Sequence, residues 1–347
     1  MTAGTALATA LANWCGSDPM RSAIAAVINQ FAETGTQVAE LIAASPLNQT
    51  QAPRGPINAS GDEQKALDVQ AEELFISALA TCQVAAVGSE ETEEAIILNP
   101  TGALVVALDP IDGSSNLDIN APIGTIFSVL PTTGFKDDPA GALLQSGRHQ
   151  VAAGAIVYGP STVMAVTWGS GTDIFAFDPA TKVFIQTHKQ LDLVADACEY
   201  AVNASNARHW SPGIRAYVAD LVGGAHGPRE KDFNMRWLAC LVAETYRILL
   251  RGGIYLYPDD KRPAYAQGRL RLVYEANPVA FLCEQAGGLA TNGIDPILDL
   301  VPTYLHQRTP LVFGSRNKVD RVRRYLLNPS TIQQDAPLFA QRGLLRK

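Results

Sequence analysis

Hydrophobic and polar positions along the chain follow patterns that predict its helices and strands. An apolar stripe with the i, i+3, i+4, i+7 and i+8 spacing of one helix face runs from Ala71 to Leu79, and Asp68 stands where a capping residue would start that helix. Residues 84–87 and 104–108 are continuously apolar, which predicts strands buried on both faces. The second of these runs stops at Asp109, so polar chemistry begins where the predicted burial ends.

The second half of the chain begins with the same alternation. A helical stripe covers 238–249 and stops at the glycine pair 252–253, and Arg236 stands at the predicted helix start. A strand is predicted next, over 254–257.

The last predicted elements complete an alternating order. A strand is predicted over 270–275, and a helix follows it with Asn277 as N-cap and Pro278 as first helical residue. The glycine pair 287–288 is predicted to close that helix. This order favours an α/β or α+β layered architecture over a helical bundle or a β-sandwich.

The composition indicates a folded globular chain. Of its 347 residues, 47% are hydrophobic and 18% are charged, which excludes a disordered protein. No apolar run approaches the roughly 18 residues of a spanning helix, which excludes a membrane protein. The length exceeds what one core usually serves, and we expect two domains, 1–190 and 191–347.

Charge and cysteine content narrow the expected partner and compartment. The net charge of -7 argues against binding to nucleic acid or to a membrane surface. The five cysteines are scattered without a CxxC motif, so neither a disulfide framework nor a cysteine metal site is indicated. The first basic residue is Arg21, so the start lacks the basic region of a secretory signal. We therefore expect a cytoplasmic protein with a small molecule as partner.

Charge is unevenly distributed along the chain. Residues 62–118 contain twelve acidic residues against one basic residue, and residues 229–271 contain nine basic residues against five acidic ones. Solvated faces meeting at an interface would explain this distribution. A metal-dependent phosphate enzyme would explain it as well, because it combines a cation-binding half with an anion-binding half.

The strongest motif is the run 109–116, Asp-Pro-Ile-Asp-Gly-Ser-Ser-Asn, directly after a predicted buried strand. Asp109 and Asp112 at the carboxyl end of a strand can share a hard divalent cation. Gly113 and Ser114 then offer backbone N–H groups, which suit a phosphate next to that cation. The alternative is an ordinary Asp-Gly turn, although two acids in one eight-residue run argue against it.

Four further acids are candidates for the same site. Glu90 and Glu91 follow the predicted strand 84–87, so one could bind a metal while the other acts as general base, although such a pair is more often a solvated helix start. Glu275 is a lone acid at the end of an apolar run, where it needs a cation or a raised pKa. Asp68 is most simply a helix cap, and capping would still leave one oxygen for a catalytic water.

The run 109–116 resembles the signature of the magnesium-dependent, lithium-sensitive phosphatases, and the chain resembles the class I fructose-1,6-bisphosphatases over about residues 61–315. That resemblance implies a multilayer α/β/α/β/α sandwich, with a metal-binding, regulatory-type domain before a sugar-phosphate-binding domain. The supporting segments are 61–62, 67–69, 88–91, 109–116, 124–127, 151–154, 252–258, 270–278 and 286–288.

The resemblance also implies a metal site and a pair of acids that activate water. Two or three Mg²⁺ ions per subunit, with Mn²⁺ as a substitute, are the expected cofactors. Asp68 and Glu91 match the acids that activate the attacking water. The implied metal ligands are Glu90, Asp109, the Ile111 carbonyl, Asp112 and Glu275.

The implied substrate contacts fall into two groups. Around the reacting 1-phosphate they are Asp112, Gly113, Ser114 and Ser115, and around the 6-phosphate they are Asn203, Arg236 and Tyr257. The family's arginine reaches in from a neighbouring subunit, which implies a homo-oligomer, a tetramer by resemblance. Arg269 stands where a sugar-binding lysine is common, and Asn206 and Trp237 stand where animal members often have tyrosines.

The implied reaction is hydrolysis of D-fructose 1,6-bisphosphate to fructose 6-phosphate and phosphate, in gluconeogenesis or the Calvin cycle. Sedoheptulose 1,7-bisphosphate, which presents the same reacting end, is a second candidate substrate. Control by AMP is not expected, because Ala103 and Leu104 replace the family's Lys-Tyr pair. Control by thioredoxin is not expected either, because residues 131–160 contain no cysteine.

Two alternative functions remain at this point. An inositol-monophosphatase-like enzyme would carry a Trp-Asp-x-Ala-Ala-Gly motif, and residues 274–278 read Tyr-Glu-Ala-Asn-Pro instead. A non-catalytic metabolite-binding protein on the same fold would be expected to lose a metal acid, and none is lost. Other enzyme classes are disfavoured because GxSxG, GxxxxGK and HExxH motifs are missing from the sequence.

Overall fold

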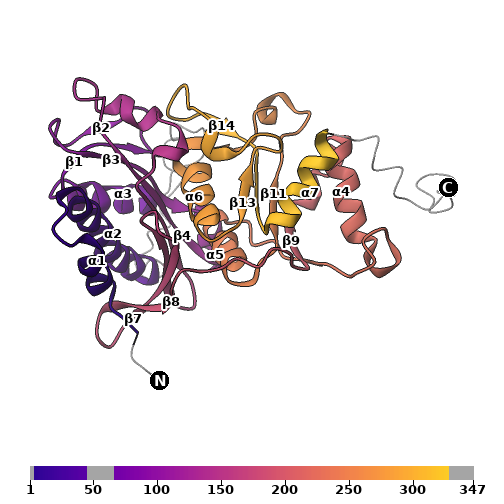
Figure 1. Cartoon of the computed structure of the whole chain (residues 1–347), viewed down its shortest axis with the longest axis horizontal. Helices are drawn as coiled ribbons and strands as arrows, with labels where there is room; N and C mark the ends of the chain where they lie inside the picture. The colour runs from indigo at the N-terminus through magenta and orange to yellow at the C-terminus, as the bar shows by residue number, and fades with distance from the viewer. Residues whose placement is uncertain (1–3, 45–65, 328–347) are drawn as a thin grey trace.

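The computed structural model describes residues 4–44 and 66–327, which Figure 1 shows as a ribbon. Its larger sheet has eight strands in the order β2-β1-β3-β4-β5-β6-β7-β8. Only the β1 and β3 pair is parallel among them. The strands are β1 (Val84–Ser89), β2 (Ile96–Ile97), β3 (Leu104–Asp112), β4 (Ile123–Pro131), β5 (Ala152–Tyr158), β6 (Thr162–Thr167), β7 (Thr172–Asp178) and β8 (Val183–His188).

The smaller sheet has five strands in the order β10-β9-β11-β15-β13. They are β9 (Glu199–Val202), β10 (Asn234–Met235), β11 (Ile254–Tyr257), β13 (Leu289–Thr291) and β15 (Leu311–Gly314). A separate two-stranded ribbon pairs β12 (Leu270–Arg271) with β14 (Arg308–Thr309).

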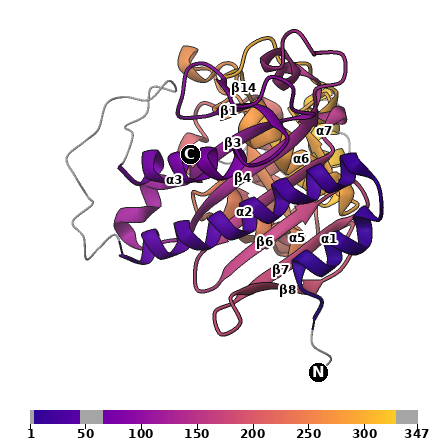
Figure 2. The same ribbon diagram turned by 90° about the vertical axis from the view of Figure 1, so that its left-hand side faces the viewer.

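Helices and sheets alternate in five layers. Helices α1 (Leu7–Cys15), α2 (Pro19–Ala44) and α3 (Ala66–Leu79) pack on one face of the larger sheet, and Figure 2 shows α2 lying across it. Helices α5 (Leu241–Arg251) and α6 (Asn277–Gln285) share a core with both sheets. Helices α4 (Pro212–Val222) and α7 (Arg316–Leu327) cover the outer face of the smaller sheet. The predicted α/β/α/β/α layered fold is therefore confirmed.

The helix predicted near Asp68 is confirmed, but its start differs. α3 begins at Ala66, so Asp68 lies inside its first turn and does not cap it. Gly61 and Asp62, on which the resemblance also drew, lie outside the described residues. The strands predicted over 84–87 and 254–257 are present as β1 and β11.

β3 continues four residues beyond the predicted strand, to Asp112. Its pairing with β4 resumes after a register shift, with Asp109 opposite Ile126 and Asp112 opposite Gly124. Both aspartates are therefore part of the sheet, and every residue of the strand is buried. Pairing across the irregularity keeps the backbone extended through Asp112, and the chain turns only at Gly113.

The helix predicted over 238–249 starts later, and Arg236 is not at its start. α5 begins at Leu241, because Ala239 has a positive φ of 54° and Cys240 is extended. Asn116 Nδ2 also donates to the Leu238 carbonyl at 2.9 Å, which holds this segment outside the helix. Arg236 instead follows the short strand β10, and its N–H donates to Tyr200 O at 2.8 Å.

The strand predicted over 270–275 is wrong after Arg271. Residues Leu272–Ala276 form one π-helical turn that leads directly into α6. Asn277 is itself helical, with φ -63° and ψ -52°, so it is not an N-cap. All five residues of the turn are buried, and an apolar run buried on every side has no periodicity that separates a strand from a helix.

Two other features of the fold bear on the sequence predictions. Within the described ranges, no helix combines the length and apolar character that a membrane crossing requires. All five cysteines are free thiols.

Candidate active site

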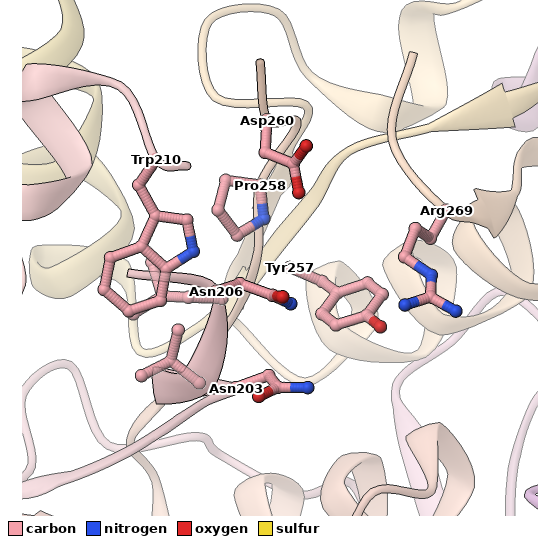
Figure 3. A pocket seen from close by; sticks show the side chains of 9 residues that line it. Asn203, Asn206, Trp210, Tyr257, Pro258, Asp260 and Arg269 are labelled. Carbon is pink, nitrogen blue, oxygen red and sulfur yellow. The ribbon is translucent and has the colours of Figure 1, made fainter. Parts of the chain in front are cut away.

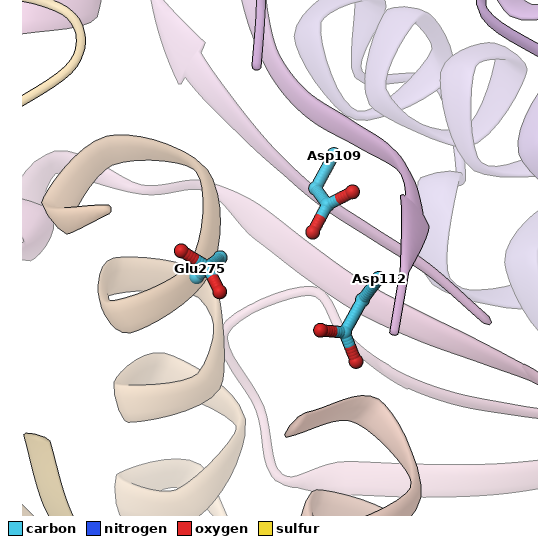
Figure 4. A group of neighbouring side chains, drawn as sticks. All are labelled: Asp109, Asp112 and Glu275. Carbon is cyan, nitrogen blue, oxygen red and sulfur yellow. The ribbon is translucent and has the colours of Figure 1, made fainter. Parts of the chain in front are cut away.

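Three buried carboxylates converge at the carboxyl end of β3 (Figure 4). Asp109 and Asp112 come from the strand, and Glu275 comes from the π-helical turn before α6. One oxygen of each lies within 4.8 Å of the others. The fold thus brings Glu275 to two aspartates that lie more than 160 positions earlier in the sequence.

Burial and mutual repulsion dominate the electrostatics of this cluster. Burial, followed by the charges of Glu90, Asp112 and Glu275, raises the pKa of Asp109 well above its ordinary range. Burial also raises the pKa of Asp112 to about 6 and that of Glu275 well above its ordinary range. Without a cation, the cluster is therefore electrostatically unfavourable in its charged form.

The amino end of α5 stabilises the charged form of Asp112. Val242 N–H donates to Asp112 Oδ2 at 2.6 Å, and Cys240 Sγ lies 3.2 Å from the same oxygen. These hydrogen bonds lower the pKa of Asp112 against the larger effect of its burial. One carboxylate oxygen is thus engaged by α5, and the position of α5 is tied to the cluster.

Glu90 and Glu91 follow β1 and lie beside this cluster. Glu90 N–H donates to Leu108 O at 3.0 Å, which continues the pairing of β1 with β3. The charges of both glutamates contribute to the raised pKa of Asp109, so both acids are close to it. Arg271 is a nearby cation, and its Nη2 lies 3.5 Å from Glu90 Oε1.

Asp68 and Glu72 are buried on α3, which packs against β1 and β3. Burial raises the pKa of Glu72, whose side chain hydrogen-bonds to the Ser89 hydroxyl. Ser89 Oγ in turn accepts from Glu91 N–H at 3.3 Å. Glu72 was not a site candidate from the sequence, although its i+4 spacing from Asp68 indicates a shared helix face.

The candidate 1-phosphate residues form a tight turn after β3. Gly113 has a φ of 77°, and a 3-10 turn over Ser114–Ile119 follows it. A Cβ at Gly113 would lie 2.8 Å from Cys240 Sγ, so only glycine allows α5 to approach this closely. Ser114 is half-buried and Ser115 is exposed, while Ile111 is buried between the two aspartates.

A second group of candidate residues lines a pocket at the end of β11 (Figure 3). Asn203, Tyr257 and Arg269 line it together, as does Asn206. The Arg269 guanidinium lies 5.9 Å from the Tyr257 ring centroid. Arg269 lines the pocket, and the backbone N–H of Arg271, two residues later, donates to Glu275 Oε2, so the pocket adjoins the carboxylate cluster.

Arg236 is the sequence-predicted residue that does not join this pocket. Its side chain is half exposed, and its Nε lies 3.8 Å from Glu199 Oε1. Sequence reasoning missed two charged residues, Asp260 in the pocket wall and Arg262, which donates to both Asp260 and Asn206 Oδ1. The excess of bases over 229–271 was a signal for this region, but it did not single out these residues.

The cluster fits a hard divalent cation. Its donors are carboxylate oxygens of three acids from two segments, and Mg²⁺ and Mn²⁺ prefer such oxygen ligands. A bound cation would offset the burial and the mutual repulsion that raise the pKa values of these acids. Arg271 supplies one positive charge near Glu90, which is fewer than the acids present. The donor set therefore supports a metal centre next to a cationic pocket.

Comparisons with known proteins identify the family. The family model "Fructose-1-6-bisphosphatase, N-terminal domain" matches residues 17–189, and "Fructose-1-6-bisphosphatase, C-terminal domain" matches residues 193–327. A class 1 fructose-1,6-bisphosphatase of Rhizobium meliloti is 50% identical over 95% of each chain. One from Azorhizobium caulinodans is 52% identical over 91% of this chain and 97% of its own.

Solved structures agree with these matches. The holo form of Leishmania major fructose-1,6-bisphosphatase superposes with a TM-score of 0.86 at 32% identity, covering 93% of this chain and 99% of its own. The T-state structure of the same enzyme gives a TM-score of 0.82 at 30% identity over the same shares. Because both halves, the full-length relatives and the fold agree, the chain belongs to the fructose-1,6-bisphosphatase family.

Proposed function

We propose that this protein hydrolyses the 1-phosphate of D-fructose 1,6-bisphosphate to give fructose 6-phosphate and phosphate. The observation that carries this proposal is the adjacency of a carboxylate cluster suited to divalent cations and a pocket lined by Arg269 and Tyr257. A substrate with two phosphates needs both parts, one for the reacting end and one for the far end. Membership of the family supports the same reaction.

The proposed cofactors are two or three Mg²⁺ ions per subunit, with Mn²⁺ as a substitute. When bound, such ions neutralise phosphoryl oxygens and lower the pKa of water. The residues proposed to hold them are Glu90, Asp109, the Ile111 carbonyl, Asp112 and Glu275.

Glu91 and Asp68 are the proposed acceptors of the proton from the attacking water. Glu91 is close enough to Asp109 to contribute to its raised pKa, so it lies beside the reacting centre. Asp68 is buried on α3, one helical turn before Glu72, where the site excludes bulk water. A positioned carboxylate of this kind typically accelerates a proton transfer by about 10² to 10⁴.

Substrate binding is proposed to use both ends of the sugar. Asp112 and the turn Gly113–Ser115 contact the reacting phosphate, because the left-handed Gly113 starts a turn directly after Asp112 of the carboxylate cluster. Asn203, Tyr257 and Arg269 contact the far phosphate. Binding energy at the far end then orients the near phosphate for in-line attack.

A wider set of properties belongs to the same proposal. We infer a homo-oligomer, a tetramer, in which Arg236 of a second copy completes the far-phosphate pocket.

We also infer two domains, 1–190 and 191–347. The two sheets support that division, as do the two family models, one of which ends at 189 while the other begins at 193. A cytoplasmic location fits the free thiols, and gluconeogenesis or the Calvin cycle is the proposed context.

Phosphate release with Mg²⁺ tests the proposal. We expect turnover of fructose 1,6-bisphosphate, no turnover of fructose 6-phosphate or inositol 1-phosphate, and complete loss in excess EDTA. Sedoheptulose 1,7-bisphosphate is included, because its reacting end is the same and the far pocket decides whether it fits. Full activity in EDTA would rule out the metal mechanism, and a preference for inositol 1-phosphate would favour the related phosphatase class.

A further inference from the structure

Residues 303–309, here called the bracing segment, connect two parts of the active site that come from distant parts of the sequence. The segment ends in β14, which pairs with β12 so that Leu270 faces Thr309 and Arg271 faces Arg308. Leu272 N–H also donates to Gln307 O at 2.7 Å. The bracing segment is therefore fixed to the arm that carries Glu275.

The bracing segment also contacts the loop after β1, which carries Glu90 and Glu91, through His306. Its Nε2 lies 3.0 Å from the Thr92 carbonyl oxygen, across 214 positions of sequence. A carbonyl oxygen only accepts hydrogen bonds, so His306 Nε2 must carry the proton and donate it. Thr92 directly follows Glu91 and is two residues from Glu90, so this bond restrains the loop that carries both glutamates.

The imidazole is itself held in place from the Glu275 side. Its ring centroid lies 5.4 Å from that of Tyr274, which is fully buried and precedes Glu275 in the chain. Tyr274 in turn lies against Gly88 of β1, where a Cβ would be 3.5 Å from Tyr274 Cε1. One imidazole thus contacts the neighbour of Glu91 and the neighbour of Glu275.

Electrostatic repulsion explains why such a restraint is needed. Burial is the largest cause of the raised pKa values of Asp109 and Glu275, and the charge of Glu90 is the second, so the loop after β1 is repelled by the acids that it must approach. Residues Glu90 to Glu94 lie outside the strands, so the regular pairing of the sheet does not restrain the part of the loop beyond Glu90. A hydrogen bond from His306 to the Thr92 carbonyl opposes that repulsion.

We propose that His306 is a positioning residue that holds Glu90 and Glu91 in reach of Asp109 and Glu275 for cation binding. The inference rests on the proposed function for its role in turnover, but its effect on cation affinity can be measured without substrate. Partners that orient metal ligands typically change metal affinity or activity by about 10- to 100-fold when they are removed.

The test compares three variants with the parent. His306→Phe retains a ring against Tyr274 and removes the donor, His306→Gln retains an N–H donor, and Tyr304→Ala changes a half-exposed neighbour in the same segment. Free Mn²⁺ is measured by electron paramagnetic resonance during titration of each protein without substrate. We expect His306→Phe to bind Mn²⁺ about tenfold more weakly, and His306→Gln and Tyr304→Ala to remain within about twofold of the parent.

Two outcomes would overturn the proposal. Parent-like Mn²⁺ affinity in His306→Phe would show that the hydrogen bond does not position the acids. Equal losses in His306→Phe and His306→Gln would show that the imidazole acts through its shape and not as a donor. The Mn²⁺ titration contains no substrate. A parent protein that failed to hydrolyse fructose 1,6-bisphosphate would therefore contradict the proposed function, while the Mn²⁺ affinities of the variants would still test the role of His306.

Kinetics provide a second readout. With saturating Mg²⁺, His306→Phe should lower kcat, because displacement of Thr92 also displaces Glu91, while KM for the bisphosphate stays within about twofold of the parent. The far-phosphate pocket lies at the end of β11 and does not include the bracing segment. A rise in KM with unchanged kcat would contradict the assigned role.

Discussion

At the scale of single residues, the buried acids at the end of β3 link stability to pH. Burial raises the pKa of Asp112 from an ordinary 3.8 to about 6, and the pKa values of Asp109 and Glu275 are raised as well. The folded state therefore holds these protons more tightly than the unfolded state. Its stabilisation from them is complete below pH 3.8 and is lost as the pH rises through about 6.

The first prediction follows from this sign. In EDTA, the melting temperature should be lower at pH 8 than at pH 5. Mn²⁺ should raise the melting temperature more at pH 8 than at pH 5, because the acids are already charged at pH 8 and bind the cation without losing protons. Differential scanning calorimetry of the parent and Asp112→Asn checks this expectation. A steeper pH dependence in the variant than in the parent would contradict the assignment.

Glu91 carries the second residue-scale prediction. Glu91→Gln should lower kcat by about 10² to 10⁴ with little change in KM, because the amide cannot accept the proton of the attacking water. Glu93→Gln, which changes an exposed acid two residues away, is the matched control and should behave as the parent. Steady-state kinetics with saturating Mg²⁺ measure both, and an unchanged kcat in Glu91→Gln would show that this acid is a bystander.

At the scale of elements, the contact between the end of β3 and the amino end of α5 sets the position of Asp112. Asp112 accepts from Val242 N–H at 2.6 Å, and a side chain at Gly113 would meet Cys240 Sγ at 2.8 Å. The strand end and the helix can approach this closely only because residue 113 has no side chain. A change at Gly113 should therefore act on the metal centre through the position of α5.

The third prediction compares two glycines with the same backbone constraint. Gly113→Ala and Gly134→Ala both place alanine at a positive φ, 77° and 88°, and each should lose about 1–2 kcal/mol of unfolding free energy. A Cβ at Gly134 would have nothing within 4 Å, whereas a Cβ at Gly113 would lie 2.8 Å from Cys240 Sγ. Gly113→Ala should therefore lose more unfolding free energy than Gly134→Ala, and only Gly113→Ala should bind Mn²⁺ more weakly. Urea unfolding and Mn²⁺ titration separate the two effects, and equal behaviour of the variants would refute this coupling.

At the scale of the whole molecule, the surroundings of Arg236 bear on the proposed oligomer. Glu199, the acid closest to it, already pairs with Arg247 and Arg251 at 2.6 Å each, so the 3.8 Å contact of Arg236 adds little within its own chain. Its side chain is half exposed, and Met235 and Leu238, which lie near it in the chain, are exposed as well. This arrangement suits a residue that serves a second copy of the chain.

The fourth prediction tests that arrangement. Arg236→Ala should raise KM for the bisphosphate by about 10- to 100-fold, as expected for loss of a charge-assisted bond to phosphate, and should leave Mg²⁺ activation intact. Mixing it with Glu91→Gln under proven subunit exchange should restore activity, because a hybrid site combines one chain's Glu91 with the other chain's Arg236. The control is a mixture of Arg236→Ala with a chain that carries both changes, which supplies no intact Arg236. No recovery of activity in the first mixture would show that Arg236 acts in the site of its own chain or in no site.

The sequence by itself determined the layered fold class, the strands at 84–87, 104–108 and 254–257, and the helix at 71–79. These elements depend on local periodicity and on turn residues, which a short stretch of sequence already contains. The acids of 109–116 were predictable for the same reason, because ligands that are neighbours in the chain need only one correctly placed strand. Glu90, Glu91 and Glu275 were candidates because each follows or ends a predicted strand, the resemblance assigned their roles, and the fold places all three near Asp109.

Only the tertiary structure decided how the remaining parts meet. Glu275 lies on a π-helical turn that the sequence could not distinguish from a strand, because residues buried on every side show no periodicity. Arg236 follows β10 because this segment pairs with β9, while Asn116, more than a hundred residues earlier, holds the Leu238 carbonyl outside α5. The bond from His306 to Thr92 likewise depends on the pairing of β12 with β14. Contacts of this kind arise from packing between distant segments, and no local pattern encodes which segments will pack together.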